Sequence, residues 1–145
     1  MMEEQVFGAG GKSRRTRSVW EAMKRGFAGR CPHCGQGRLF RAYLKTVENC
    51  DECGEVISHH RADDLPAYLV IVVVGHIVVG GFMGLEAMTD WPSWLHLAIW
   101  LPVTLLMSLW LIGPVKGAVV GLQWAQHMHG FGGEPDTAET HPELR

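Results

Sequence analysis

Four cysteines form one pattern near the N-terminal end of the 145-residue chain. Two CxxC pairs, Cys31 with Cys34 and Cys50 with Cys53, are separated by fifteen residues, and a glycine follows each pair directly. A CxxC turn directs two sulfurs at one point, and two such turns complete a tetrahedral metal site. Four thiolates that leave no open position suit one structural zinc ion. The spacing therefore predicts a zinc ribbon over residues 30–57.

Other cysteine chemistry stays open from the spacing alone. The four thiols could instead form a pair of disulfides, a redox-active CxxC couple, or a copper or iron centre. Residues 30–57 offer little apolar core, so we expect this small module to need its metal in order to fold.

Two long apolar segments follow the cysteines. Residues 65–85 and 91–115 contain no Asp, Glu, Lys or Arg, and at 21 and 25 residues each can cross a hydrocarbon core of about 30 Å as a helix. Residues 86–90 between them predict an outer loop, so transmembrane helices over 65–85 and 91–113 should form an antiparallel hairpin. The expected fold class is a mainly α membrane protein: a small cytoplasmic zinc-ribbon module, then a two-helix transmembrane hairpin. The alternative is a buried hairpin in a soluble protein.

The basic residues predict the direction of the hairpin. Eleven of the thirteen Lys and Arg lie between Lys12 and Arg61, Lys116 follows the second span, and the connecting loop has none. Because basic residues near a span are retained on the cytoplasmic side, both termini should be cytoplasmic. Thiols there stay reduced, which favours a metal site over disulfides.

The flanking segments carry weaker patterns. Residues 1–17 predict a disordered basic tail that can rest on anionic lipid, and 130–145 a disordered acidic tail. Residues 18–29 predict an amphipathic helix that begins with a Ser18/Glu21 capping box and lies on the membrane or against the zinc module. Gly113-Pro114 should break or bend the second helix, leaving an interfacial helix over 114–129.

Several polar residues near the spans are candidate functional groups. Asp63 and Asp64 precede Pro66, where a carboxylate can cap the first helix, and one of them could pair with Lys116. His76 lies near the middle of the first span, where an ionisable group is unfavourable and needs a hydrogen-bonding partner or a role in haem, copper or proton chemistry.

Two further features bear on metals and on self-association. His96 lies about 9 Å from His76 in depth, which opposes shared ligation of one haem within a single hairpin. His127 and His129 resemble a copper-binding pair, without a further pattern to support it. The GxxxG steps at residues 80–84 and 117–121 permit either packing within the chain or a homo-oligomer.

The composition argues against a nucleic-acid binder. The formal net charge is −2, and between Met1 and Asp64 nine acidic residues accompany the eleven basic ones. The sequence also shows no nucleophile, base and oxyanion arrangement of the kind that catalysis needs, so we expect no enzyme unless the aspartates and His76 act together at the membrane.

Taken in order, these motifs resemble those of the bacterial "domain of unknown function 983" family over residues 25–127. The matching motifs are Cys31-Pro-His-Cys34-Gly, Gly37-Arg-Leu-Phe40, Cys50-x-x-Cys53-Gly, Arg61-Ala-Asp-Asp64-x-Pro66-Ala-Tyr68, Gly75-His76, Pro114-Val-Lys116-Gly117 and Gly121-Leu-Gln-Trp124. The resemblance implies a cytoplasmic zinc-binding module with two transmembrane helices, and it makes the four cysteines the metal ligands. Asp63, Asp64, Pro66, His76 and Lys116 match recurrent polar and turn positions of the family, whereas Leu65 departs from the small residue expected there.

The family has no established activity, but in alphaproteobacteria its genes tend to lie among those for cytochrome c oxidase subunits and assembly factors. The first hypothesis is therefore a noncatalytic protein of the bacterial inner membrane that holds membrane-protein partners, during assembly of a respiratory oxidase. A metal- or haem-handling redox protein that uses His76 is one alternative. A membrane-bound sensor or regulator is another.

Overall fold

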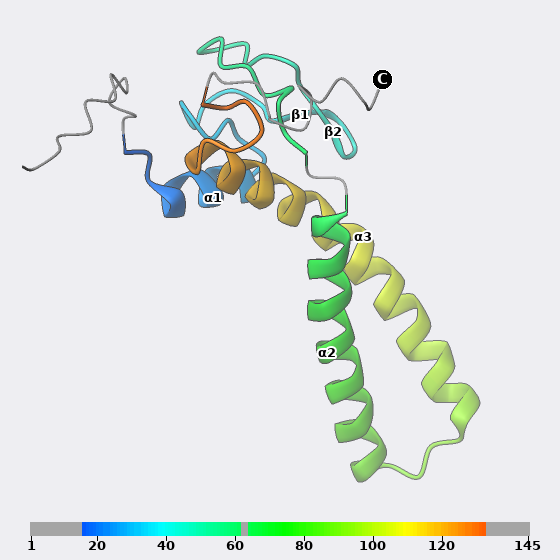
Figure 1. Cartoon of the computed structure of the whole chain (residues 1–145). Coiled ribbons are helices and arrows are strands. Elements are labelled where there is room, and N and C mark those ends of the chain that lie inside the picture. Colours follow the sequence, from blue (N-terminus) through cyan, green and yellow to red (C-terminus); the bar gives the residue numbers. More distant parts are fainter. Residues whose placement is uncertain (1–15, 62–63, 133–145) are drawn as a thin grey trace, which may run out of the picture.

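The computed structural model describes residues 16–61 and 64–132, which form helices and one two-stranded sheet. In chain order the elements are α1 (Val19–Phe27), β1 (Phe40–Ala42), β2 (Lys45–Thr46), α2 (Leu65–Met88) and α3 (Ser93–Ala125). Figure 1 shows α2 and α3 as an antiparallel hairpin that projects from a small unit made of α1, the strands and the end of α3. The prediction of a mainly helical chain with two long apolar helices and an N-terminal cysteine cluster is confirmed. Residues 1–15, 62–63 and 133–145, which include Asp63 and most of both predicted tails, lie outside the described residues.

Helix α2 is longer than predicted at its C-terminal end. It has 24 residues and is long and apolar enough to cross a membrane, by length and composition. The helix continues past Leu85 through Glu86 to Met88, and the Thr89 hydroxyl then donates to the Leu85 carbonyl at 2.8 Å. The predicted loop over 86–90 is therefore wrong in its bounds: residues 89–92 connect the two helices.

Helix α3 runs without a break from Ser93 to Ala125, so the predicted bounds 91–113 and 114–129 are wrong, and of the break or bend predicted at Gly113-Pro114 the break does not occur. Pro114 has no backbone N–H, so one helical hydrogen bond is missing, but the helix continues on both sides of it. Contacts with α1 and with residues 30–57 hold the segment beyond Pro114 and offset the lost hydrogen bond. Figure 1 shows a change of direction where α3 leaves the hairpin, so the helix bends but does not break.

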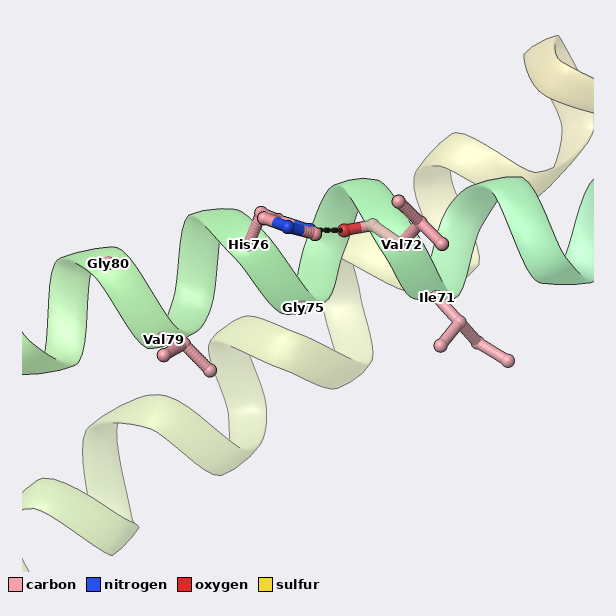
Figure 2. Close-up of a pocket in the computed structure, with 6 residues that line it drawn as sticks. All are labelled: Ile71, Val72, Gly75, His76, Val79 and Gly80. Carbon is pink, nitrogen blue, oxygen red and sulfur yellow. Dashed lines mark hydrogen bonds between the residues drawn. The ribbon is translucent and has the colours of Figure 1, made fainter.

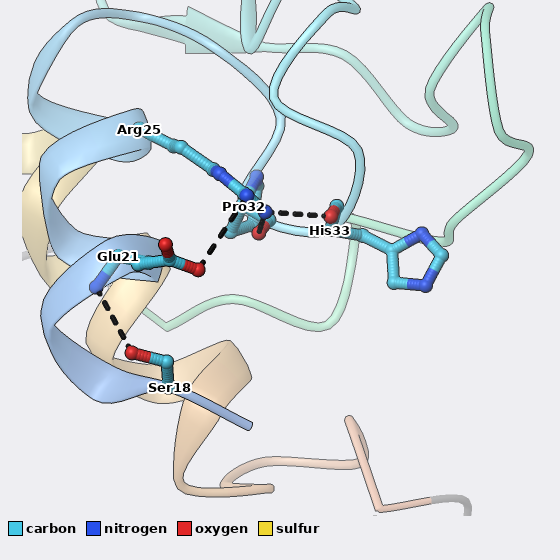
Figure 3. A network of polar contacts seen from close by, with 5 residues as sticks. All are labelled: Ser18, Glu21, Arg25, Pro32 and His33. Atoms are coloured by element: carbon cyan, nitrogen blue, oxygen red, sulfur yellow. Dashed lines mark hydrogen bonds and ion pairs between the residues drawn. The ribbon is translucent and has the colours of Figure 1, made fainter. Parts of the chain in front are cut away.

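Helix α1 begins with half of the predicted capping box. The Ser18 hydroxyl oxygen accepts a hydrogen bond from the Glu21 amide at 3.4 Å. The Glu21 carboxylate does not complete the box, because it pairs instead with Arg25 one turn later, at 3.6 Å. Figure 3 shows these contacts at the N-terminal end of α1.

Helices α1 and α3 cross at small residues. A Cβ on Gly26 would overlap the Gly117 carbonyl, and a Cβ on Gly117 would overlap the Gly26 carbonyl. One turn further along α3, a Cβ on Gly121 would overlap the Ala22 carbonyl. Small residues at this spacing let two helix backbones approach closely. The GxxxG step at 117–121 therefore serves packing within the chain.

Residues 30–57, here called the cysteine module, share their core with α3. Strands β1 and β2 pair antiparallel with Phe40 opposite Thr46, and the turn between them places Leu44 at a φ of 58°. The core combines residues of the module with Val119 and Val120 of α3; its module members are Cys31, Leu39, Cys50 and Ile57. The module thus gains from α3 apolar surface that it lacks by itself.

Candidate metal centre

Each cysteine pair lies in a tight loop that ends at a glycine. The Gly35 amide donates to the Cys31 carbonyl at 2.8 Å, and the Gly54 amide donates to the Cys50 carbonyl at 2.9 Å. Both glycines adopt positive φ, 70° and 73°, which a residue with a Cβ rarely does. Isolated antiparallel bridges close the two loops, one joining Arg30 to Arg38 and the other Asn49 to Val56. The chain thus builds two similar sulfur-bearing turns.

The four sulfur atoms lie at the spacing of a tetrahedral metal site. All four Sγ atoms are within 4.8 Å of one another. Cys31 Sγ is 3.8 Å from Cys53 Sγ, and Cys34 Sγ is 3.7 Å from Cys50 Sγ, so each short distance joins the two turns. A tetrahedral ion with metal–sulfur bonds of about 2.3 Å separates its sulfurs by about 3.8 Å. The four residues fit one metal ion, and they are free cysteines.

The surroundings of the thiols make their acidities unequal. Backbone amides of Gly37 and Gln36 face Cys34 and lower the pKa of its thiol from 9.0 to about 6. Burial raises the pKa of Cys31, and partial desolvation raises the pKa of Cys53. In the metal-free site at neutral pH, Cys34 is a thiolate, whereas Cys31 and Cys53 hold protons that a metal must displace.

The first cysteine turn is attached to α1 through Arg25. Its guanidinium donates to the carbonyls of Pro32 and His33, at 3.3 and 2.9 Å (Figure 3). The same side chain lies against Gly35, where a Cβ would meet it at 3.0 Å. Arg25 therefore connects the helix that packs on α3 with the loop that holds two sulfurs.

Trp124 lies near the end of α3 and contacts both cysteine turns. This role was not predicted from the sequence. Its indole Nε1 donates to the Glu55 carboxylate, beside the second turn, at 2.9 Å. The His33 ring, in the first turn, meets the indole edge-on at 5.6 Å. Arg17 covers the indole face at 4.2 Å and donates to the Trp124 carbonyl at 2.7 Å. The Gly121-Leu-Gln-Trp124 motif was the one sequence signal for this contact.

Three more side chains join α3 to the module and to the segment before α2. The Gln123 amide accepts from the Arg61 backbone N–H at 3.1 Å and donates to the Arg61 carbonyl at 2.8 Å. Lys116 Nζ donates to the Leu44 carbonyl at 2.8 Å. The Tyr43 hydroxyl donates to the Leu109 carbonyl, also at 2.8 Å.

The aspartate roles that we predicted are not observed at Asp64. Asp64 is the N-cap residue of α2, but its backbone is already helical and its side chain makes no capping hydrogen bond. Residues that cap through their side chains are typically extended. No ion pair joins Asp64 to Lys116, which binds Leu44 instead, and Asp63 lies outside the described residues.

His76 and His96 lie in different surroundings. His76 is exposed on α2 beside an open cleft of about 490 Å³, which is lined by α2 residues alone: Ile71, Val72, Gly75, His76, Val79 and Gly80 (Figure 2). Its Nδ1 donates to the Val72 carbonyl at 2.7 Å, which leaves Nε2 as an acceptor. His96 is buried in the hairpin against Phe82 and Trp91, and neither of its ring nitrogens has a hydrogen-bond partner. The structure therefore does not bring the two histidines together.

His127 and His129 lie in the turn after α3, both at positive φ. Within residues 16–61 and 64–132, the only group of three or more Cys, His, Asp or Glu placed to hold a metal ion is the set of four cysteines. No described histidine belongs to such a group.

Comparison with known proteins identifies a family but no relative of known activity. No curated protein and no solved structure matches the chain. A family model described as "Protein of unknown function (DUF983)" matches residues 40–124, which include the second cysteine pair, both long helices and Trp124. Because this match covers more than half of the chain, the protein belongs to the DUF983 family.

Proposed function

We propose that this protein is a noncatalytic zinc protein of the bacterial inner membrane, in which a zinc ribbon is fixed to the cytoplasmic end of a transmembrane hairpin and the hairpin binds other membrane proteins. The observation that carries the proposal is the shared core of the cysteine module and α3. This core and the hydrogen bonds from Trp124, Gln123 and Lys116 make the ribbon and the hairpin one unit. A partner bound to either part would contact a fixed arrangement of both.

Zinc suits the four cysteines best. The sulfur separations of 3.7 and 3.8 Å agree with zinc–thiolate geometry. Cys31 and Cys50 are 0% and 3% exposed, and four sulfurs leave no ligand position open for a substrate. The bound ion would supply a tetrahedral cross-link between the two turns. We therefore assign it a structural role.

Membrane insertion has two supports. Helices α2 and α3 are long and apolar enough to span a bilayer, and only 11% and 6% of the residues in their apolar windows are buried in the isolated chain. The basic residues cluster before α2 and at Lys116, which favours a cytoplasmic module and cytoplasmic termini.

The outer face of α2 supports a partner helix as the ligand of the hairpin. A Cβ at Gly75 or at Gly80 would meet nothing within 4 Å. The free Nε2 acceptor of His76 lies on the same helix, beside the cleft that Gly75 and Gly80 line. A helix with small residues and a hydrogen-bond donor could approach this face closely. We propose a membrane-protein partner here; a second copy of the chain is the competing occupant.

Metal analysis tests the proposal first. Protein purified from membranes in mild detergent should contain one zinc per chain and show no visible chromophore. Stoichiometric iron or copper, or a haem absorption band that disappears in His76→Leu, would replace the proposal with a redox function. Recovery of the full chain in the soluble fraction, without detergent, would contradict the membrane assignment.

Oxidase assembly is the narrower form of the proposal, and it rests on the family resemblance. Deletion of the gene should lower the amount of assembled cytochrome c oxidase, and complementation with Gly80→Leu should fail although the variant accumulates normally. Complementation with Leu97→Ala, which alters an exposed side chain on α3, is the control. Unchanged oxidase content in the deletion strain would eliminate this form.

A further inference from the structure

Helix α1 and α3 form an apolar cleft on the surface of the protein. The cleft encloses about 410 Å³ and is lined by Trp20, Met23, Lys24 and Phe27 of α1 and by Ala118 of α3. Trp20 is 68% exposed and Phe27 is also exposed. Lys24 is the single charged residue of the lining, and its Nζ lies 5.9 Å from the centre of the Trp20 ring. The cleft thus combines aromatic walls with one cation.

The aromatic side chains of Trp20 and Phe27 lie away from the contacts that hold α1 to the rest of the protein. The opposite face of the helix makes the structural contacts, because Ala22 and Gly26 cross α3 and Arg25 binds the first cysteine turn. Trp20 and Phe27 remain on the exposed side of α1, where Ala118 of α3 borders the cleft. A helix with an exposed apolar face and basic residues beside it is typical of a membrane interface.

The cleft lies near the point where α3 leaves the hairpin and begins to contact the cysteine module. Ala118 follows Lys116, and the turn between β1 and β2 reaches α3 through the Tyr43 bond to Leu109. Next to Leu109, Trp110 is 71% exposed, and Tyr43 is exposed as well. Trp and Tyr favour the boundary between hydrocarbon and headgroups. In Figure 1, α1 lies beside the part of α3 that extends beyond the hairpin.

The charge of the module is divided along the chain. Residues 16–45 contain seven Lys or Arg and one Glu, whereas residues 46–60 contain four Asp or Glu and no Lys or Arg. The basic part includes α1, which packs on α3 at Gly117 and Gly121, and the strand turn, whose Tyr43 binds Leu109 of α3. These two segments therefore carry the charge that complements an anionic surface, and the second cysteine turn carries the opposite charge.

We propose that the α1–α3 cleft binds an anionic phospholipid of the same membrane, with Trp20 and Phe27 against the upper acyl chain and Lys24 at the headgroup. This assignment rests on the membrane insertion proposed above. It fixes the cysteine module against the bilayer, with the basic half of the module toward the lipid and the acidic half toward the cytoplasm.

Fluorine NMR on the full chain separates this inference from membrane insertion itself. The protein, with all six tryptophans replaced by 5-fluorotryptophan, is reconstituted into phosphatidylcholine vesicles, and each resonance is assigned from a single Trp→Phe variant. A phosphatidylcholine that carries a nitroxide at its headgroup is then added. We expect the Trp110 and Trp20 resonances to broaden. If the Trp110 resonance broadens and the Trp20 resonance stays sharp, the proposal of a lipid in the cleft is overturned but membrane insertion stands. If the Trp110 resonance stays sharp, membrane insertion is overturned.

A second measurement tests the charge of the lipid. Adding phosphatidylglycerol to the vesicles should shift the Trp20 resonance of the wild type and of Lys24→Arg but not of Lys24→Glu. An equal shift in all three proteins, or none in the wild type, would overturn the anionic headgroup assignment. If Trp20→Phe fails to fold, Phe27→Trp supplies a seventh resonance on the same wall of the cleft, and its broadening or sharpness decides the question.

Discussion

The carbonyl groups of Gly26 and Gly117 occupy the places where a Cβ on the other residue would lie. This contact joins α1, which precedes the first cysteine turn, to the part of α3 that completes the core of the cysteine module. Both groups are backbone, so a side chain there cannot be accommodated by a rotamer change.

Gly117→Ala should destabilise the protein, because the added methyl group forces the two helices apart. We expect a loss of about 2 kcal/mol, in the range of overpacked cores. Gly84→Ala is the matched control, since its Cβ would meet nothing within 4 Å and alanine favours a helix by roughly 0.5–1 kcal/mol. Thermal unfolding in detergent measures both. Equal midpoints for the two variants would contradict the close crossing of α1 and α3.

Metal affinity should fall steeply as the pH falls. Above pH 6, metal binding displaces at least the protons of Cys31 and Cys53, because both thiols have raised pKa values. The logarithm of the metal association constant should therefore fall by at least two units for each unit that the pH falls. Below the Cys34 pKa of about 6, protonation of Cys34 competes as well, and the slope should increase by about one. Competition with a chelator of known proton stoichiometry measures the slope. A slope that stays constant through pH 6 would show that Cys34 is not acidified.

Gln123→Leu should loosen the segment that leads into α2. The substitution removes both hydrogen bonds to the Arg61 backbone, at a cost of about 1–3 kcal/mol. Trypsin cleavage after Arg61 should then accelerate by roughly tenfold, because opening of this segment becomes more frequent. Gln126→Leu, at an exposed position three residues further along, is the control. Trypsin should cleave this variant after Arg61 at the wild-type rate. Similar cleavage of all three proteins would exclude a role for Gln123 in holding the junction.

His96→Phe should stabilise the hairpin. The imidazole is 5% exposed and both nitrogens lack a partner, and burial of an unpaired polar group costs roughly 1–3 kcal/mol. A phenyl ring keeps the aromatic contacts with Phe82 and Trp91. We expect a gain of about 1 kcal/mol in unfolding free energy, and no comparable gain for His76→Phe, whose ring is exposed. A loss of stability in His96→Phe would instead show that His96 binds a water molecule or a partner.

The sequence by itself determined the features that depend on local spacing and on length. The two CxxC pairs with their glycines predicted that four sulfurs meet. Each CxxC turn is formed by its own few residues, and two turns of this kind face one metal ion. The apolar runs predicted two long helices, because helix length and hydropathy are properties of a continuous segment. The ordered motifs identified the family, which the match over residues 40–124 confirms.

Only the tertiary structure decided how these parts join. Pro114 predicts a break or a bend from its missing amide hydrogen, and contacts beyond it keep α3 continuous. Gly117 and Gly121 fit packing within the chain or between chains equally well, until the position of α1 assigns them to the first. Lys116 binds the Leu44 carbonyl, an acceptor that a reading of charges does not consider. Such contacts join residues far apart in the chain, so their partners depend on packing and not on local spacing.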